Sequence, residues 1–556
     1  MSNKGGAPLL RVCVIGKGGL AIDCAEVLAG SCELRAVISD HPAFLSWAAA
    51  RRVWCANSLG ELPDGFFDEI DYLFSIANGC ILDPRTLSAP QCGCINYHNG
   101  PLPRYAGVHA TSWAIFNGET THGVTWHMMT PQIDGGDILQ QATFSLDPGE
   151  TTASLNRKCS EVAGQAFRQL LRGLLEGRLT RRPQERKLRS YYGLHQKIPG
   201  AGLICWDQTA VSIDRLWRTL EFGPAPNALG SAKVRLTSGT YVVRSLELAS
   251  GAADTRPGTV VQTTAEGISV ATSEGGIVLR HLTTLEGKPF SLAQAMETMH
   301  IQVGARLPFV SPHEVAAAEE LAAHASPHER FWLMTLHAAL LRQPAADGGP
   351  SEKGGRSTSW SLPLPPSSRC RLQQWSEAHG LSESDFLEAT AALCHFRFSG
   401  RPTVFLHQRD EVSADADPCS LICPYLPIPF DMSPTQTATK AVLAVVEARR
   451  NAERHVPLLR DVFVRSPLLR QGKVMCGFAF TSSPMPEDVP AGVKCDLVIR
   501  AAVGSSVTLE IASCLPDFPL PAFVRCLREL IESILQDPSR PLLSLPILDR
   551  GASLQV

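Results

Sequence analysis

Short apolar runs alternate with helix-like patterns over the first 195 residues. Runs rich in apolar and β-branched residues predict strands, and apolar side chains at helical spacing predict helices between and after them. The predicted strands are 9–16, 33–39, 71–77, 94–98 and 123–129, and the clearest predicted helices are 19–29 and 151–177. This alternation is typical of an α/β fold, here a Rossmann-like, mostly parallel sheet with helices on both faces.

The pattern changes after a basic, proline-containing stretch at 181–193. One amphipathic helix comes next, and its apolar side chains at helical spacing are Ile213, Leu216, Trp217 and Leu220. Several short β-rich segments follow, separated by glycine and polar turns. One helix with short strands after it predicts a small, partly closed, OB-like β-barrel.

A third unit begins near residue 325, and a segment of linker composition at 344–359 lies near its start, after the helix that opens it. Helical patterns are found near 312–343, 382–397, 433–455 and 520–536. The sequence therefore predicts three domains, which cover residues 1–195, 200–308 and 325–556.

Composition and charge narrow the class of protein. The chain has 51 basic and 54 acidic residues, a formal net charge of −3, which does not favour a nucleic-acid partner. No apolar run approaches the roughly 18 residues that a membrane helix needs, so we expect a soluble, cytoplasmic protein with no membrane partner. The 17 cysteines are scattered without zinc-ligand spacing, which predicts buried side chains and no metal site.

A glycine-rich turn near the N-terminus invites a cofactor hypothesis. Gly16, Gly18 and Ala21 fit the G-x-G-x-x-G/A dinucleotide fingerprint, and Asp40 lies at the end of the second predicted strand. A tight first turn between strand and helix tolerates the same glycines. We favour that structural interpretation, because the rest of the sheet carries a different set of polar residues.

The stretch CINYHNGPLPRYAG, residues 94–107, is the most informative for chemistry. The two-residue period of a strand puts Asn96 and His98 on one face, together with Cys94. An amide and an imidazole then project together from the C-terminal end of a strand. Ligands bind at that end in open α/β sheets.

Two carboxylates follow later in the sequence, and the first of them, Asp134, lies 36 residues after His98. Asp134 and Asp137 flank a Gly-Gly turn that comes after the last predicted strand. A carboxylate beside His98 would orient the imidazole, stabilise its protonated form and raise its pKa. With Asn96 as a donor to an oxyanion, this set suits acyl transfer to an amine.

These residues carry a resemblance to a known family. The runs NYHNGPLPRYAG and GVTWHMMTPQIDGGDIL resemble the formyltransferases that use 10-formyltetrahydrofolate, which include methionyl-tRNA, glycinamide ribonucleotide and nucleotide-sugar formyltransferases. Order and spacing are preserved over residues 10–180. The resemblance implies an enzyme that takes its formyl group from 10-formyltetrahydrofolate, with catalytic positions at Asn96, His98 and Asp134.

The same resemblance implies binding positions. Residues 77–84 (ANGCILDP) fall on the loop that binds the pterin ring. The implied folate-site residues are Asn78, Cys80, Leu82 and Gln132, and the implied substrate-binding residues are Arg104 and Tyr105. One departure lies on the acceptor side of the pocket, where the family's Ser-Leu-Leu-Pro reads Gly-Pro-Leu-Pro from Gly100 to Pro103.

The remaining domains carry resemblances of their own. Residues 203–236 are similar to the small C-terminal domain of the tRNA and sugar members. Residues 325–550 resemble the C-terminal lobe of a nonribosomal peptide synthetase condensation domain, an acyltransferase-type α/β half-domain. The segments that carry this second resemblance are HERFWLMTL, ESDFLEATAALCHF, CPYLPIPFDM and ESILQDPSRPLLSLPILD. The other lobe's His-His-x-x-x-Asp-Gly motif has no counterpart, so we expect an adaptor that makes no peptide bond.

The amine acceptor is left open between three classes. Residues 51–150 hold 4 basic and 11 acidic side chains, a local net charge of −7, which does not suit tRNA phosphates. Residues 157–197 hold 11 basic and 3 acidic residues, and a solvated helix face explains this excess at least as well as an RNA-binding track does. The condensation-like lobe favours an aminoacyl group on a carrier protein, with carrier and adenylation domains as partners. A nucleotide-sugar or other small-molecule amine is the alternative, and a catalytically silent docking module of a synthetase is the second.

Overall fold

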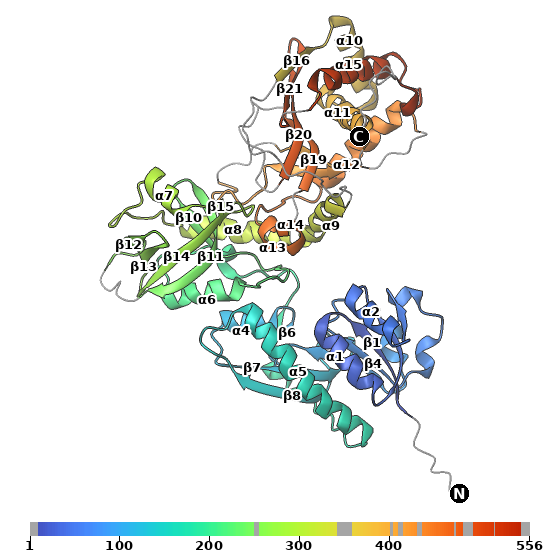
Figure 1. The fold of residues 1–556 in the computed structure, drawn as a ribbon, viewed down its shortest axis with the longest axis vertical. Helices are drawn as coiled ribbons and strands as arrows, with labels where there is room; N and C mark the ends of the chain where they lie inside the picture. Colours follow the sequence, from blue (N-terminus) through green and yellow to red (C-terminus); the bar gives the residue numbers. More distant parts are fainter. Residues whose placement is uncertain are drawn as a thin grey trace. The chain divides into compact units, whose positions relative to one another are not determined.

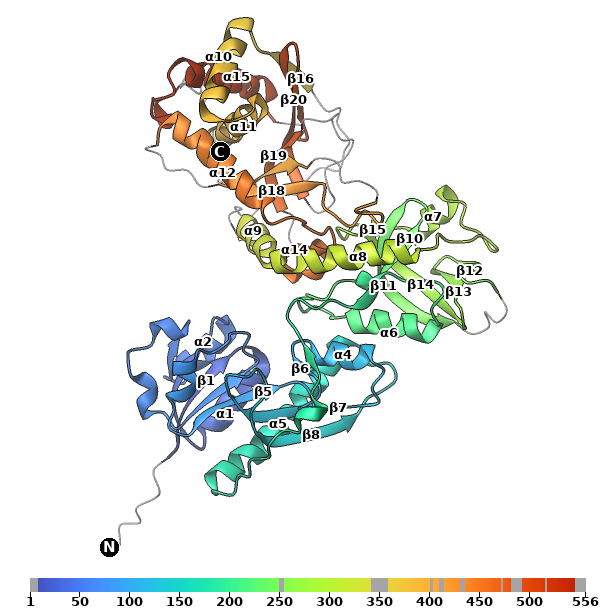
Figure 2. The ribbon, with the colours of Figure 1, turned by 180° about the vertical axis from the view of Figure 1, so that it is seen from behind.

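The computed structural model describes residues 9–249, 255–341, 359–400, 404–409, 415–430, 436–471, 474–481, 493–515 and 518–545. Its contacts divide the chain into two compact units (Figures 1 and 2). Unit 1 is Met1–Gln196 with Asp214–Gly223, and unit 2 is Lys197–Ile213 with Pro224–Val556. All but the last residue of the predicted linker at 344–359 lies outside the described residues.

Unit 1 is built on a seven-stranded sheet in the order β3-β2-β1-β4-β5-β7-β8. The strands are β1 (Arg11–Gly16), β2 (Glu33–Ile38), β3 (Trp54–Ala56), β4 (Tyr72–Ile76), β5 (Gly93–His98), β7 (Thr121–Met128) and β8 (Ile138–Ser145). The first five pair in parallel, while β7 and β8 are antiparallel to their neighbours. The predicted mostly parallel sheet is confirmed, and β3 and the edge strand β8 are additions to it.

Helices cover both faces of this sheet. The helices are α1 (Gly18–Ala29), α2 (Pro42–Ala50), α3 (Pro84–Ser88), α4 (Ala110–Phe116) and α5 (Thr152–Leu175). Apolar side chains of α1, α2 and α5 share one buried cluster with Val12, Val14 and Ile95. The opposite cluster holds Cys13, Ile15 and Cys94 against α3 and nearby turns. Because neighbouring residues of β5 enter opposite clusters, the predicted alternation along this strand is confirmed.

The glycines of the dinucleotide-like turn have a structural reason to be there. A Cβ atom on Gly16 would lie 1.9 Å from the carbonyl oxygen of Ile76 on the neighbouring strand β4. Gly18 begins α1 with a φ of 79°, which side chains rarely adopt. The turn therefore needs glycine whether or not a nucleotide binds.

Unit 2 begins with a second, antiparallel sheet in the order β10-β11-β14-β13-β12, with β15 beside β14. Its strands are β10 (Lys233–Leu236), β11 (Gly239–Ala249), β12 (Val260–Thr264), β13 (Gly267–Ala271), β14 (Gly276–Thr284) and β15 (Pro289–Phe290). The predicted amphipathic helix is α6 (Ala210–Leu220), whose residues are divided between the two units. Closure of the sheet into an OB-like barrel stays a prediction.

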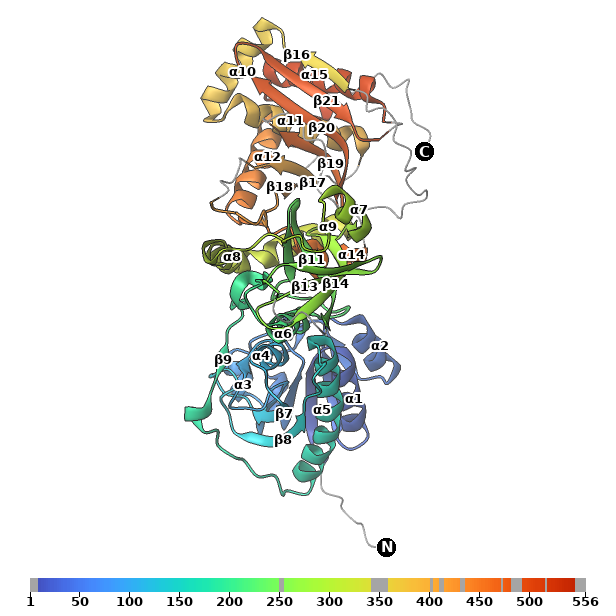
Figure 3. The same cartoon turned by 90° about the vertical axis from the view of Figure 1, so that its left-hand side faces the viewer.

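The rest of unit 2 is a mixed α/β layer with a sheet in the order β16-β21-β20-β19-β17-β18. Its strands are β16 (Ser359–Pro363), β17 (Val404–Gln408), β18 (Tyr425–Pro429), β19 (Val474–Thr481), β20 (Val493–Val503) and β21 (Val507–Ser513). One face of this sheet is covered by α10 (Pro366–His379), α11 (Glu383–Ser399), α12 (Ala438–Glu453) and α15 (Leu520–Gln536) (Figure 3). The condensation-like identity of this layer stays a prediction.

The connecting helices of unit 2 are α7 (Leu292–Thr298), α8 (Pro312–Ala325), α9 (Glu329–Leu341), α13 (Val462–Arg465) and α14 (Pro467–Gln471). Of these, α9 packs against β18 and β19. None of the helices in the described part of the chain has the length and apolar character to span a bilayer.

Buried charges join the antiparallel sheet that contains β10 to the helices α9 and α13. Asp461 accepts a hydrogen bond from Ser231 at 2.8 Å and lies 3.0 Å from the ammonium of Lys233. Arg465 contacts Asp461 at 3.0 Å and Glu329 at 2.6 Å. Burial alone would raise the pKa of Asp461, but Arg465 and Lys233 hold it well below its ordinary value. A chain that ends near residue 310 would therefore keep Lys233 but lose Asp461, its carboxylate partner.

We expect Asp461→Ala to lower the free energy of unfolding of the full chain by about 3–5 kcal/mol, because Lys233 and Arg465 lose a buried partner. Urea unfolding measures this. The lowered pKa means that the contribution is complete above the ordinary carboxyl pKa and is lost as the pH falls below it. Glu447→Ala, which breaks the exposed pair with Arg454, is the control and should cost less than about 1 kcal/mol. Equal effects of the two variants would contradict the buried role.

Candidate active site

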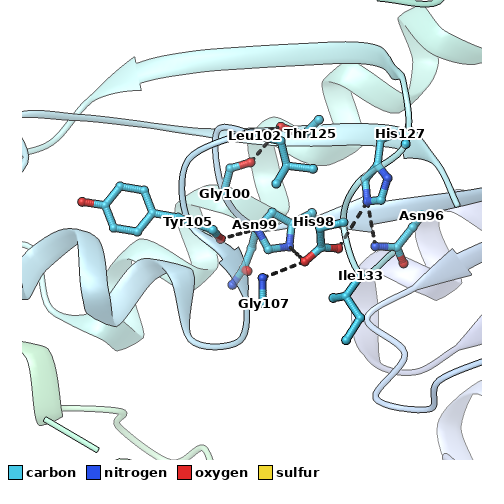
Figure 4. Close-up of polar contacts among 12 residues, drawn as sticks. Asn96, His98, Asn99, Gly100, Leu102, Tyr105, Gly107, Thr125, His127 and Ile133 are labelled. Carbon is cyan, nitrogen blue, oxygen red and sulfur yellow. Dashed lines mark hydrogen bonds and ion pairs between the residues drawn. The ribbon is translucent and has the colours of Figure 1, made fainter. Parts of the chain in front are cut away.

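Two neighbouring strands supply the polar side chains of the site. In the antiparallel pairing of β5 with β7, Asn96 lies opposite His127 and His98 lies opposite Thr125. Directly opposed residues point to the same face of a sheet. The amide nitrogen of Asn96 is accordingly 3.2 Å from Nε2 of His127 (Figure 4). No sequence pattern points to His127, because only the register of the two strands places it beside Asn96.

Asp134 enters from the loop between β7 and β8. The backbone folds back tightly here: Asp134 has a φ of 49°, and a Cβ atom on Gly136 would lie 2.0 Å from the carbonyl oxygen of Met128. The carboxylate lies between two imidazoles, 3.5 Å from Nδ1 of His98 and 3.4 Å from Nε2 of His127. The structure thus brings together Asn96, His98 and Asp134, and adds His127.

The protonation of His98 follows from its partners. Its Nε2 lies 2.7 Å from the carbonyl oxygen of Tyr105. A carbonyl oxygen only accepts hydrogen bonds, so this nitrogen carries the hydrogen. In the neutral ring the lone pair is then on Nδ1, which faces Asp134. A proton taken up by His98 would therefore arrive next to a carboxylate.

Burial is the largest influence on the pKa of the His98 imidazole. It lowers the pKa of His98 below the ordinary value, and the attraction of Asp134 offsets only part of that change. The expectation that Asp134 raises this pKa is therefore wrong in its net direction, since the ring is 6% exposed and its charged form loses water. At neutral pH His98 is an uncharged base.

Asp134 keeps its charge despite burial. Burial would raise its pKa, but His98, His127 and the Gly107 N–H, which donates to Oδ2 at 2.8 Å, bring it well below the ordinary value. The site thus pairs an ionised carboxylate with a neutral imidazole. This pair can accept a proton and stabilise the cation that results.

His127 orients the amide of Asn96. Its Nδ1 lies 2.8 Å from the carbonyl oxygen of Met128 and therefore carries the ring hydrogen of the neutral form. Its Nε2 then accepts one of the two amide N–H groups of Asn96. The side chain of Asn96 is held in one orientation by this bond.

Sequence profiles and curated relatives match the part of the chain that holds this site. Residues 69–171 match the profile described as "Formyl transferase", and residues 198–300 match "Formyl transferase, C-terminal domain". The methionyl-tRNA formyltransferase of Trichlorobacter lovleyi is 33% identical over 248 residues, which are 44% of this chain and 74% of that protein. The chain belongs to the formyl transferase family.

Two further comparisons give the extent of the likeness. The methionyl-tRNA formyltransferase of Geotalea uraniireducens is 34% identical over 218 residues, 39% of this chain and 66% of that protein. A solved N-formyltransferase from Helicobacter canadensis, in complex with folinic acid and dTDP-3-aminofucose, aligns with a TM-score of 0.40 and 18% identity, over 49% of this chain and 99% of that one. Both matched family segments end by residue 300.

The loop that follows β4 lies beside Asn96, because Ser75 pairs with Asn96 across the parallel strands β4 and β5. Asn78 shapes this loop: its amide group donates to the Cys80 carbonyl at 3.1 Å and accepts the Cys80 N–H at 3.0 Å. Leu82 is 3% exposed and packs in the core cluster with Cys13 and Ile15. Gln132 is exposed. The folate-site assignment of these residues stays a prediction.

The two predicted substrate-binding residues of this family member differ in exposure. Arg104 is half exposed and forms an ion pair with Glu119. Tyr105 is 2% exposed, and its phenol donates to Glu119 at 2.6 Å. The carbonyl oxygen of Tyr105, which binds His98, is what this residue contributes to the site.

The departure at Gly100 has a clear consequence for His98. A Cβ atom at this position would lie 2.7 Å from Nε2 of His98 and 3.1 Å from Cβ of Ala110. The imidazole packs directly against the glycine. A side chain here would push the ring away from the Tyr105 carbonyl.

We expect Gly100→Ala to shift the imidazole NMR signals of His98, because the added methyl group occupies the space beside Nε2. A His98→Gln variant assigns those signals. Gly149→Ala is the matched control, since a Cβ atom there meets nothing within 4 Å. Identical His98 spectra in wild type and Gly100→Ala would contradict the close approach.

Proposed function

We propose that this chain transfers a formyl group from 10-formyltetrahydrofolate to a primary amine. The observation that carries the proposal is the buried carboxylate of Asp134 between His98 and His127, with Asn96 hydrogen-bonded to His127, at the C-terminal end of β5 in a member of the formyl transferase family. The proposed donor site is the loop at 77–82 with Gln132.

The proposed reaction exchanges one carbon–nitrogen bond for another. The amine nitrogen bonds to the formyl carbon, and the bond between that carbon and N10 of the folate breaks. One proton leaves the amine and one reaches N10, so the protons balance. His98 takes the amine proton on Nδ1 and passes it to the leaving nitrogen. Asp134 stabilises the imidazolium that exists between these two steps.

Asn96 has a separate part in this proposal. Negative charge develops on the formyl oxygen when the amine attacks. The amide N–H of Asn96 that is not bonded to His127 would donate to this oxygen. His127 supports the step indirectly, because it fixes the direction of the amide and contacts the other oxygen of Asp134.

For the acceptor we propose an aminoacyl group tethered to a carrier protein. The support is the resemblance of residues 325–550 to a condensation lobe, together with how the cations of 157–197 are used. Lys158 pairs with Asp147, and Arg189 donates to the Ile133 carbonyl. Cations occupied in this way are less available to RNA phosphates.

A second acceptor is favoured by a different observation. The relatives with 33% and 34% identity are methionyl-tRNA formyltransferases. Methionyl-tRNA and an aminoacyl carrier both present the α-amine of an amino acid held through an activated carboxyl group. Nucleotide-sugar amines are the third class to test. A silent docking module is disfavoured by the complete Asn96, His98 and Asp134 set.

We expect Asn96→Ala to lower the rate of formyl transfer by about 10²–10³-fold, because one oxyanion donor is lost. His98→Ala should be at least as damaging. Because burial lowers the pKa of His98, the midpoint of the acidic side of the wild-type pH–rate profile should lie below the ordinary imidazole value of 6.5. His281→Ala, an exposed histidine of unit 2, is the control. Full activity in Asn96→Ala or His98→Ala would refute the assignment.

We expect folate to stabilise the full chain, by about 2.7 kcal/mol at one hundred times its dissociation constant. NAD and NADP should leave the melting temperature unchanged. Labelled 10-formyltetrahydrofolate, offered with an aminoacyl carrier, methionyl-tRNA or a nucleotide amino sugar, then identifies the acceptor from the labelled product. Stabilisation by NAD without folate binding would contradict the proposed donor.

A further inference from the structure

The segment that leads from unit 1 to unit 2 runs back across the active site. Residues 182–192 follow α5 and end shortly before Lys197, where unit 2 begins. Arg182 forms a β-bridge with Ile138. At its other end, β9 (Tyr191–Tyr192) pairs in parallel with β6 (Ala106–Gly107). We call residues 182–192 the strap.

The strap holds the loop that carries Asp134. The side-chain amide of Gln184 donates to the carbonyl oxygens of Asp134 at 2.8 Å and Gly136 at 2.7 Å. Arg189 donates to the carbonyl oxygens of Ile133 at 2.8 Å and Asp134 at 3.3 Å. A left-handed backbone at a residue other than glycine costs on the order of 1–3 kcal/mol and persists only where its surroundings hold it. Asp134 is such a residue, and the strap supplies its surroundings.

The strap also holds the loop that contacts His98. The N–H of Tyr105 donates to Oγ of Ser190 at 2.8 Å, and the N–H of Ala106 donates to the Ser190 carbonyl at 3.0 Å. Tyr105 has a φ of 61°, and its ring stacks on that of Tyr192 with 5.6 Å between centroids. This loop presents the carbonyl that sets the His98 tautomer. It also presents the Gly107 N–H that binds Asp134.

We infer that Gln184, Arg189 and Ser190 are positioning residues. Their hydrogen bonds to the backbone of both loops hold the carboxylate of Asp134 and the imidazole of His98 in position relative to each other. The inference deepens the proposed function and rests on it for its kinetic test. It also assigns Arg189 a role inside the fold, because its guanidinium is committed to two carbonyl oxygens at the site.

Gln184→Ala is the sharpest variant, since it removes two hydrogen bonds and no charge. The titratable or charged groups that face His98 are Asp134, His127, His122 and Arg189, and the variant changes none of them. We expect kcat to fall about 10-fold to 100-fold, as misplacement near 1 Å does, with KM for 10-formyltetrahydrofolate within about twofold of wild type. The midpoint of the pH–rate profile should rise toward about 6.5, because a loosened loop admits water to His98.

Substitutions at Arg189 separate geometry from charge. Arg189→Ala removes the two hydrogen bonds to the loop and the positive charge. Arg189→Lys keeps the charge and one donor and should recover part of kcat. Arg186→Ala is the matched control: Arg186 is an exposed arginine of the same strap, and we expect wild-type kcat and pH profile. If Gln184→Ala does not fold, as judged by thermal unfolding, Arg189→Lys carries the test.

Wild-type kcat and an unchanged pH midpoint in both Gln184→Ala and Arg189→Ala would overturn the inference. A wild-type chain without formyl transfer would refute the proposed function instead. In that case NMR titration of His98 in wild type and Gln184→Ala still tests the strap. A titration midpoint that shifts upward supports positioning, and an unchanged one overturns it.

Discussion

Asp134 is an ionised carboxylate whose side chain is 9% exposed, and a buried charge is stable only when partners replace the water it has lost. Those partners come from three separate places in the chain. His98 is on β5, His127 is on β7, and the Gly107 N–H comes from the short strand β6. The arrangement of this part of unit 1 follows from keeping these groups around one carboxylate.

This requirement explains why the site depends on segments that touch no reacting atom. The loops that carry Asp134 and Tyr105 both contain left-handed backbone at residues other than glycine. Neither loop is held by a helix or a long strand of its own. The strap provides that hold, and it is also the chain's path to unit 2. A change in the strap can therefore reach the site through backbone contacts alone.

Unit 2 shows the same physical rule at a second buried carboxylate. Asp461 is buried between Lys233 and Arg465, from segments more than 200 residues apart in sequence. The pairing ties the family's C-terminal domain to the α/β layer that follows. The proposed adaptor would thus be packed against that domain through buried ion pairs, and a flexible linker would not be its only connection.

The sequence by itself determined the parallel sheet, its principal helices and the pairing of Asn96 with His98 on one face. These follow from local rules, because a two-residue period and a helical period are written in neighbouring residues. Only the tertiary structure decided the part of His127, whose place beside Asn96 depends on the register of β5 with β7. It also reversed the expected pKa shift of His98, since burial is a property of the folded chain and cannot be read from spacing. The strap escaped sequence reasoning for the same reason: its basic, proline-containing composition is that of a linker, and its role arises from side chains that meet backbone carbonyls about 50 residues away.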